Sequence, residues 1–115
     1  MVELDAFKSE LNTYTEPLKE VRDSLDLENK EKRVEELERE MEAPGFWDNA
    51  ERSQKMMKEL SALKGDMEIY HKLKNQKEEI ELMIEMGYEE NDESVIPDIE
   101  EMMEEFKTDF DHIRI

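Results

Sequence analysis

Apolar residues recur at intervals of three and four along most of this 115-residue chain, and this spacing limits the fold more than any other feature. Residues three and four apart lie on one face of an α-helix, whereas a half-buried strand shows strict alternation. The first segment carries this spacing over three heptads, at Leu4, Phe7, Leu11, Tyr14, Leu18, Val21 and Leu25. The sequence therefore predicts an all-α protein.

Proline and glycine divide this pattern into helices. The first helix should bend at Pro17 without dividing, because the apolar spacing stays in phase across it. The second begins after Asp26, whose side chain is the expected cap, and ends at Pro44-Gly45. The third is the longest, from about residue 49 to residue 86, with Gly87 as its stop.

The last helix contains Pro97, which is tolerated only in a first turn, so its cap should lie within residues 92–94. We therefore expect an up-and-down antiparallel bundle of about four helices with one long central helix, forming a single helical domain over residues 1–115. An extended coiled coil is the alternative, but the Pro-Gly break shortens the heptad runs. Ile115 is apolar, in helical phase and without a stop signal, so we expect a piece of a longer protein.

The charge is strongly acidic and unevenly distributed. The chain has 34 acidic and 16 basic residues, a net charge of −18, which disfavours DNA binding and bulk attraction to nucleic acid. Residues 49–77 contain seven basic and four acidic residues, whereas residues 78–106 contain thirteen acidic residues and no Lys or Arg. The acidic block is either a solvated face or a landing surface for a basic protein. The candidate partner face is Glu100, Glu101, Glu104 and Glu105.

No motif in the sequence carries catalytic or cofactor chemistry. The chain has no Cys, and its two His residues are far apart without ligand spacing. It has no Gly-rich phosphate loop and no Gly-x-Ser-x-Gly turn, and its acidic stretch at residues 89–94 lacks the pattern of a calcium loop. It also has no membrane-length apolar run and no signal peptide. We therefore expect a cytoplasmic protein that is not an enzyme and binds no metal or cofactor.

One short segment stands out from the helices, and it supplies the structural marker residues Pro44, Gly45, Phe46, Trp47 and Asp48. Asp48 can cap the third helix, with Glu51 completing a capping box. The two adjacent aromatic residues should plug the end of the bundle, with Arg52 stacked on the ring of Trp47. If that ring is fully buried, Trp47→Ala should cost about 3 kcal/mol.

Together with the Arg33-Val34-Glu35-Glu36-Leu37 stretch, the segment from Glu42 to Arg52 resembles the N-terminal helical domain of bacterial peptide chain release factor 2, of the class I release factor family. The resemblance implies a role in translation termination at UGA and UAA. It implies contacts with the stalk base of the ribosome, through ribosomal protein and rRNA, and with the class II release factor GTPase. The family's codon-reading Ser-Pro-Phe and hydrolytic Gly-Gly-Gln motifs do not occur here. By charge, the acidic block suits a basic ribosomal protein, and residues 49–77 are the better candidate for contact with rRNA.

A different class of function is also considered. A free-standing coiled-coil adaptor or prefoldin-like chaperone would bind proteins through an exposed apolar face. Such a protein has no need for the marker segment. A hydrolase, the third option, requires a polar constellation that the sequence lacks.

Overall fold

The computed structural model describes residues 1–113 and is built from helices, with no strand in that range. The elements are α1 (Val2–Asn12), α2 (Thr15–Ser24), α3 (Leu27–Met41), the 3₁₀ turn η1 (Phe46–Asp48), α4 (Ala50–Glu90) and α5 (Val95–Asp111). The all-α fold with a long central helix is confirmed. The expectation drawn from Ile115 lies outside the described residues.

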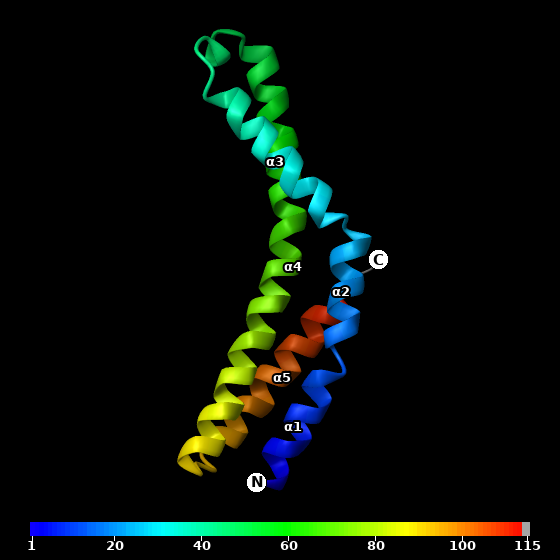
Figure 1. The fold of residues 1–115 in the computed structure, drawn as a ribbon, viewed down its shortest axis with the longest axis vertical. Helices are drawn as coiled ribbons and strands as arrows, with labels where there is room; N and C mark the ends of the chain where they lie inside the picture. The colour runs from blue at the N-terminus through cyan, green and yellow to red at the C-terminus, as the bar shows by residue number, and fades with distance from the viewer. Residues whose placement is uncertain (114–115) are drawn as a thin grey trace.

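The molecule is elongated because α4 runs along its whole length. α1, α2 and α3 follow one another upward, α4 returns through 41 residues, and α5 rises beside the lower part of α4 (Figure 1). The extents are 61 × 27 × 18 Å. None of the described helices is long and apolar enough to cross a membrane.

The first helix is two helices, so the expected single bent helix is wrong. The break lies at Thr13 and Tyr14, before Pro17, which is the third residue of α2. The first N–H groups of a helix have no partner within it, so proline at this position removes no hydrogen bond. The Thr13 hydroxyl donates to the carbonyl of Glu10 at 2.6 Å and helps to end α1.

The helix caps agree with the sequence only in part. Asp26 precedes α3 as expected, but its backbone is left-handed and its carboxylate accepts from the side chain of Asn29 at 3.0 Å. Asn49 caps α4 by accepting from the N–H of Arg52 at 3.0 Å, so the capping box predicted at Asp48 is wrong. Ser94 precedes α5, inside the expected range.

Gly87 does not end α4, contrary to the expectation. The helix continues to Glu90 and stops at Asn91, which adopts the left-handed conformation that asparagine tolerates. Gly87 is buried where α1 crosses α4, and a Cβ there would lie 2.9 Å from both Leu4 Cδ1 and Val95 Cγ2. The glycine therefore permits close helix packing.

Most of the buried apolar residues form two clusters at different heights on α4, and Val21, Leu27 and Val34 are buried outside both. We call α1, α5 and residues 71–90 of α4 the basal body; its cluster, which also includes Leu18 of α2, is Leu4, Leu11, Leu18, Leu73, Ile80, Ile84, Ile99, Met103 and Phe106. We call α3, η1 and residues 50–70 of α4 the tip hairpin, whose cluster is Leu37, Phe46 and Met56. Tyr14 packs edge-on against Phe106, with 5.1 Å between the ring centres, at the upper end of the basal cluster.

Candidate functional site

The marker segment forms the turn at the top of the tip hairpin (Figure 1). Gly45 has φ of 81°, a conformation that glycine adopts without strain, and the N–H of Phe46 donates to the carbonyl of Ala43 at 3.2 Å. Pro44 and Asp48 are exposed. The segment thus reverses the chain between α3 and α4.

Only one of the two adjacent aromatic residues is buried. Phe46 is 2% exposed and packs with Leu37 and Met56, whereas Trp47 is 58% exposed and touches Phe46 edge-on at 4.8 Å. Consecutive side chains of a 3₁₀ turn point about 120° apart, so η1 cannot direct both rings inward. The predicted burial of Trp47 is wrong.

The predicted stacking partner of Arg52 is also wrong. Its guanidinium lies 5.6 Å from the ring centre of Phe46 rather than over Trp47. The same side chain reaches Glu40 of α3 at 3.7 Å. Arg52 therefore closes the turn over the buried ring.

Ion pairs line the two edges of the tip hairpin. Arg33 of α3 donates through Nε and Nη2 to the two carboxylate oxygens of Glu59 on α4, at 2.6 and 2.9 Å. These hydrogen bonds raise the pKa of the Arg33 guanidinium and lower the pKa of the Glu59 carboxyl. The other pairs between α3 and α4 are Lys30–Asp66, Glu38–Lys64 and Glu40–Arg52.

These pairs alter the interpretation of the basic stretch at residues 49–77. Five of its seven cations lie within 4.0 Å of a carboxylate: Arg52, Lys64, Lys72, Lys74 and Lys77. Lys55 and Lys58 have no salt bridge within the described residues. Most of the positive charge on this part of α4 is therefore paired with carboxylates.

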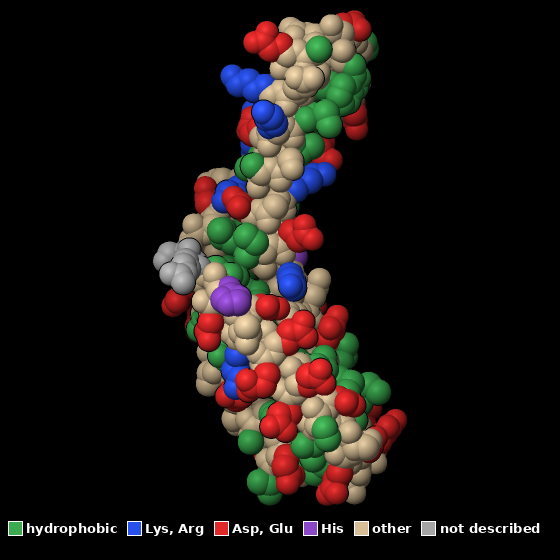
Figure 2. All heavy atoms as spheres, turned by 180° about the vertical axis from the view of Figure 1, so that it is seen from behind, with side chains coloured by type: hydrophobic (Ala, Val, Ile, Leu, Met, Phe, Trp, Pro, Cys, Tyr) green, Lys and Arg blue, Asp and Glu red, His purple; other side chains and the backbone are tan. Residues whose placement is uncertain are grey.

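The four glutamates of the candidate partner face are all exposed on α5, which lies along the lower half of the molecule, away from the marker turn (Figure 1). Glu104 pairs with Lys107 at 3.2 Å, and this hydrogen bond raises the pKa of Lys107. Within the described part of the chain, Glu100, Glu101 and Glu105 have no salt bridge. Figure 2 shows Asp and Glu side chains gathered over the lower half of the molecule, with Lys and Arg mostly above.

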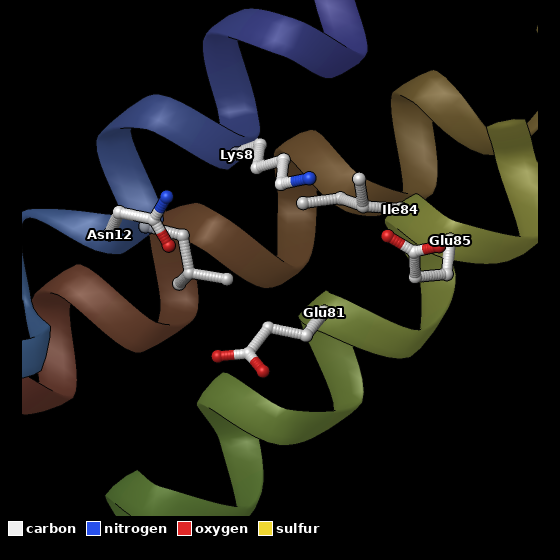
Figure 3. Close-up of a pocket in the computed structure, with 6 residues that line it drawn as sticks. Lys8, Asn12, Glu81, Ile84 and Glu85 are labelled. Carbon is white, nitrogen blue, oxygen red and sulfur yellow. The ribbon is translucent and has the colours of Figure 1, made fainter.

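A shallow groove runs between α1 and α4 in the basal body. Its volume is about 200 Å³, and Figure 3 shows Lys8 and Asn12 of α1 across it from Glu81 and Glu85 of α4. Across residues 1–113 no group of three or more His, Cys, Asp or Glu side chains could hold a metal ion. His71 lies on α4 and His112 directly follows α5, and both are exposed. The geometry favours surface contacts over an enclosed reaction site.

Comparison with known proteins identifies the family. Residues 30–115 match the PCRF domain, a range that includes most of α3, the marker turn, α4 and α5. The chain belongs to the PCRF domain family.

Curated relatives extend the similarity of this PCRF domain to nearly the whole chain. The peptide chain release factor 2 proteins of Staphylococcus saprophyticus and of an Exiguobacterium species are 35% and 36% identical to it over 114 residues. That of Staphylococcus haemolyticus is 33% identical. Each alignment covers 99% of this chain, which spans 31% of the length of the relative.

One exposed feature of this PCRF domain was not predicted from the sequence. Leu82 and Met86 of α4 are 65% and 48% exposed, although both lie inside the long apolar pattern. Ile80 and Ile84 mark the buried face, and Leu82 is two residues from each, which places it on the opposite side of the helix. That phase was the available signal.

Proposed function

We propose that this chain is the N-terminal helical domain of a class I peptide chain release factor and acts in translation termination at UGA and UAA in the cytoplasm. The observation that carries this proposal is the similarity to release factor 2 proteins along 99% of the chain. On this proposal, the domain contacts the stalk base of the ribosome and the class II release factor GTPase. Codon reading and hydrolysis belong to parts of the factor that are not in this sequence.

The geometry supports a contact role. α5, whose glutamates are exposed, lies along the lower half of a long helical body, and the exposed turn of the tip hairpin lies at its top (Figure 1). Such a body can meet partners at two separated places. The acidic face of α5 suits a basic ribosomal protein, because complementary charge speeds encounter and excludes wrong partners.

We also propose that residues 1–115 form one domain that folds alone but does not terminate translation. A release assay with purified ribosomes, fMet-tRNA and a UGA codon tests this. The 115-residue chain should release no peptide, whereas a full-length factor that contains it should release peptide at UGA and UAA. Codon-dependent release by the 115-residue chain alone would contradict the proposal. The absence of a cooperative unfolding transition in this chain would also contradict it.

The partner face can be tested by charge reversal in the full-length factor. Replacing Glu100, Glu101, Glu104 and Glu105 by Lys should slow association with termination complexes without altering stop-codon choice, because exposed charges act mainly on the association rate. The effect should fade as salt rises, since screening acts over roughly 8 Å at physiological ionic strength. Stopped-flow association across a salt series measures both.

A matched control reverses the same number of exposed charges outside α5, at Glu35, Glu42, Glu51 and Glu68. This control changes the net charge equally but leaves α5 intact. If the two variants slow association to the same extent, only the total charge matters and the α5 face has no specific role.

A further inference from the structure

Leu82 and Met86 are exposed apolar side chains that belong to neither cluster of the described residues. They lie four residues apart on α4, so they are neighbours on one helix face. That face points away from the basal core, whose α4 residues are Leu73, Ile80 and Ile84. A leucine and a methionine at this spacing resemble the contact positions of a helix that packs on another helix.

Carboxylates surround this apolar pair. Five exposed glutamates lie three or four residues from Leu82 or Met86, at Glu78, Glu79, Glu85, Glu89 and Glu90. Glu78 reaches Lys74 at 4.0 Å, and the other four have no salt bridge among the described residues. Figure 2 shows the same mixture over the lower half of the molecule, with apolar side chains set among Asp and Glu.

We propose that the α4 face centred on Leu82 and Met86 binds a basic amphipathic helix of another protein. The partner helix places apolar side chains three and four residues apart on Leu82 and Met86, and its Lys and Arg side chains meet the flanking glutamates. The apolar contact slows dissociation, and the charges speed association. This surface is separate from the α5 face and does not depend on the release-factor role.

Charge selects this occupant over three others. Nucleic acid and anionic lipid both present negative charge, which the five glutamates repel. A second copy of the chain in a two-fold dimer would bring the same patch, and therefore like charges, together. Only a partner that combines cations with apolar side chains satisfies both parts of the surface.

The first test uses a synthetic peptide that forms a helix with Leu on one face and Lys on the other. A second peptide of the same composition but scrambled order is the control for charge attraction alone. Fluorescence anisotropy with the 115-residue chain should show saturable binding of the amphipathic peptide and at least about tenfold weaker binding of the scrambled one. Equal binding of the two peptides would overturn the proposal.

Variants then locate the contact. Leu82→Ser with Met86→Ser should weaken binding of the amphipathic peptide by about tenfold or more, because the bound peptide would bury the Leu82 and Met86 side chains. Met57→Ser with Ile69→Ser is the matched control, since both are exposed apolar residues of α4 that lie away from the five glutamates around Leu82 and Met86. Both pairs are exposed, so circular dichroism should show unchanged helix content.

Three further outcomes contradict the proposal. One is equal weakening by the two double variants. Another is a self-association of the chain, seen by analytical ultracentrifugation, that the Leu82→Ser and Met86→Ser substitutions abolish. The third is binding to vesicles of anionic lipid that depends on the same two residues.

Discussion

The basal body and the tip hairpin are both packed on α4, but different numbers of helices enclose them. In the basal body, α1 and α5 both pack on α4, and the resulting core contains nine buried apolar residues. In the tip hairpin α3 and the short η1 turn pack on α4, and the buried cluster contains three residues, with Leu27 and Val34 of α3 buried outside it. Two helices form a single layer that shields one stripe of each, so much of this part of α4 stays half-exposed.

Charged pairs are distributed in the opposite way. Four salt bridges join α3 to α4 along the edges of the tip hairpin, whereas Lys107–Glu10 and Lys72–Asp109 connect helices of the basal body. Exposed ion pairs typically contribute about 0 to 1 kcal/mol each, less than a buried aliphatic side chain. The comparison teaches that the tip hairpin gains geometric order from charge, while most of the stability comes from the basal body.

The largest expected effect is at the centre of the basal body. Phe106 is fully buried and packs against Tyr14, so Phe106→Ala should cost about 4 kcal/mol of unfolding free energy. Urea denaturation followed by circular dichroism measures this loss.

Phe46→Ala in the tip hairpin is the counterpart. It should cost less, about 2 to 3 kcal/mol, because the small cluster around Phe46 can collapse into the space more readily. Amide exchange should rise mainly in α3 and residues 50–70. An equal loss from the two substitutions, with a single global transition, would remove the distinction between the regions.

The two helical glycines of α4 sharpen the comparison. Gly87→Ala should destabilise the basal body by about 1 to 2 kcal/mol, since the new methyl group meets Leu4 and Val95 in a packed core. Gly65→Ala is the control in the tip hairpin, where no atom lies within 4 Å of the new Cβ. That substitution should stabilise the protein by about 1 kcal/mol through helix propensity. Thermal unfolding of both variants gives the two signs, and equal signs would contradict the packing difference.

Trp47→Ala should have a small effect, below about 1 kcal/mol, because the ring is mostly exposed at the tip. Urea unfolding of this variant beside Phe46→Ala separates the two adjacent aromatic residues. A loss as large as that of Phe46→Ala would show that the Trp47 ring supports the turn.

The smallest effects are expected from pH, with opposite signs in the two regions. In the basal body, Tyr88 donates a hydrogen bond to Asp5, which raises the pKa of Tyr88 to about 12. The contribution of this hydrogen bond to the free energy of unfolding is present below the ordinary tyrosine pKa of 10.0 and is lost as pH rises towards 12.

In the tip hairpin, the hydrogen bond from Arg33 lowers the pKa of Glu59. The contribution of this bond to the free energy of unfolding is therefore present above the ordinary carboxyl pKa of 4.5 and is lost at lower pH. Tyr88→Phe should therefore flatten the alkaline limb of stability, and Glu59→Gln the acid limb. Urea midpoints across pH measure both, and no change in either limb would contradict these assignments.

The sequence predicted the helices well because their apolar spacing is a local property that packing reinforces. The long α4 and the turn at Pro44-Gly45 followed from spacing and from residues that interrupt helices. The role of Gly87 did not follow, because a glycine required by close packing has the same local signature as one that ends a helix. The positions of Leu4, more than 80 residues away in sequence, and of Val95 distinguish the two.

The surfaces were less predictable than the helices. The sequence identified the acidic block, since charge on a helix with an apolar face must be exposed. It did not reveal that Arg52, Lys64 and Lys72 are paired, because their partners lie on α3 and α5. Nor could it decide between Phe46 and Trp47, since the direction of each ring depends on the form of a three-residue turn.

The unbroken length of α4 has a mechanical consequence. The continuous helix α4 is packed in the large core of the basal body and carries the smaller tip hairpin at its other end, so it behaves as a lever. A small rotation of the base sweeps the Pro44-Gly45 turn through an arc that grows with the length of the lever, while residues near the pivot barely move. If partners bind at the two ends, rigid rotation of the helix would move one partner when the other moves, without any helix having to unfold.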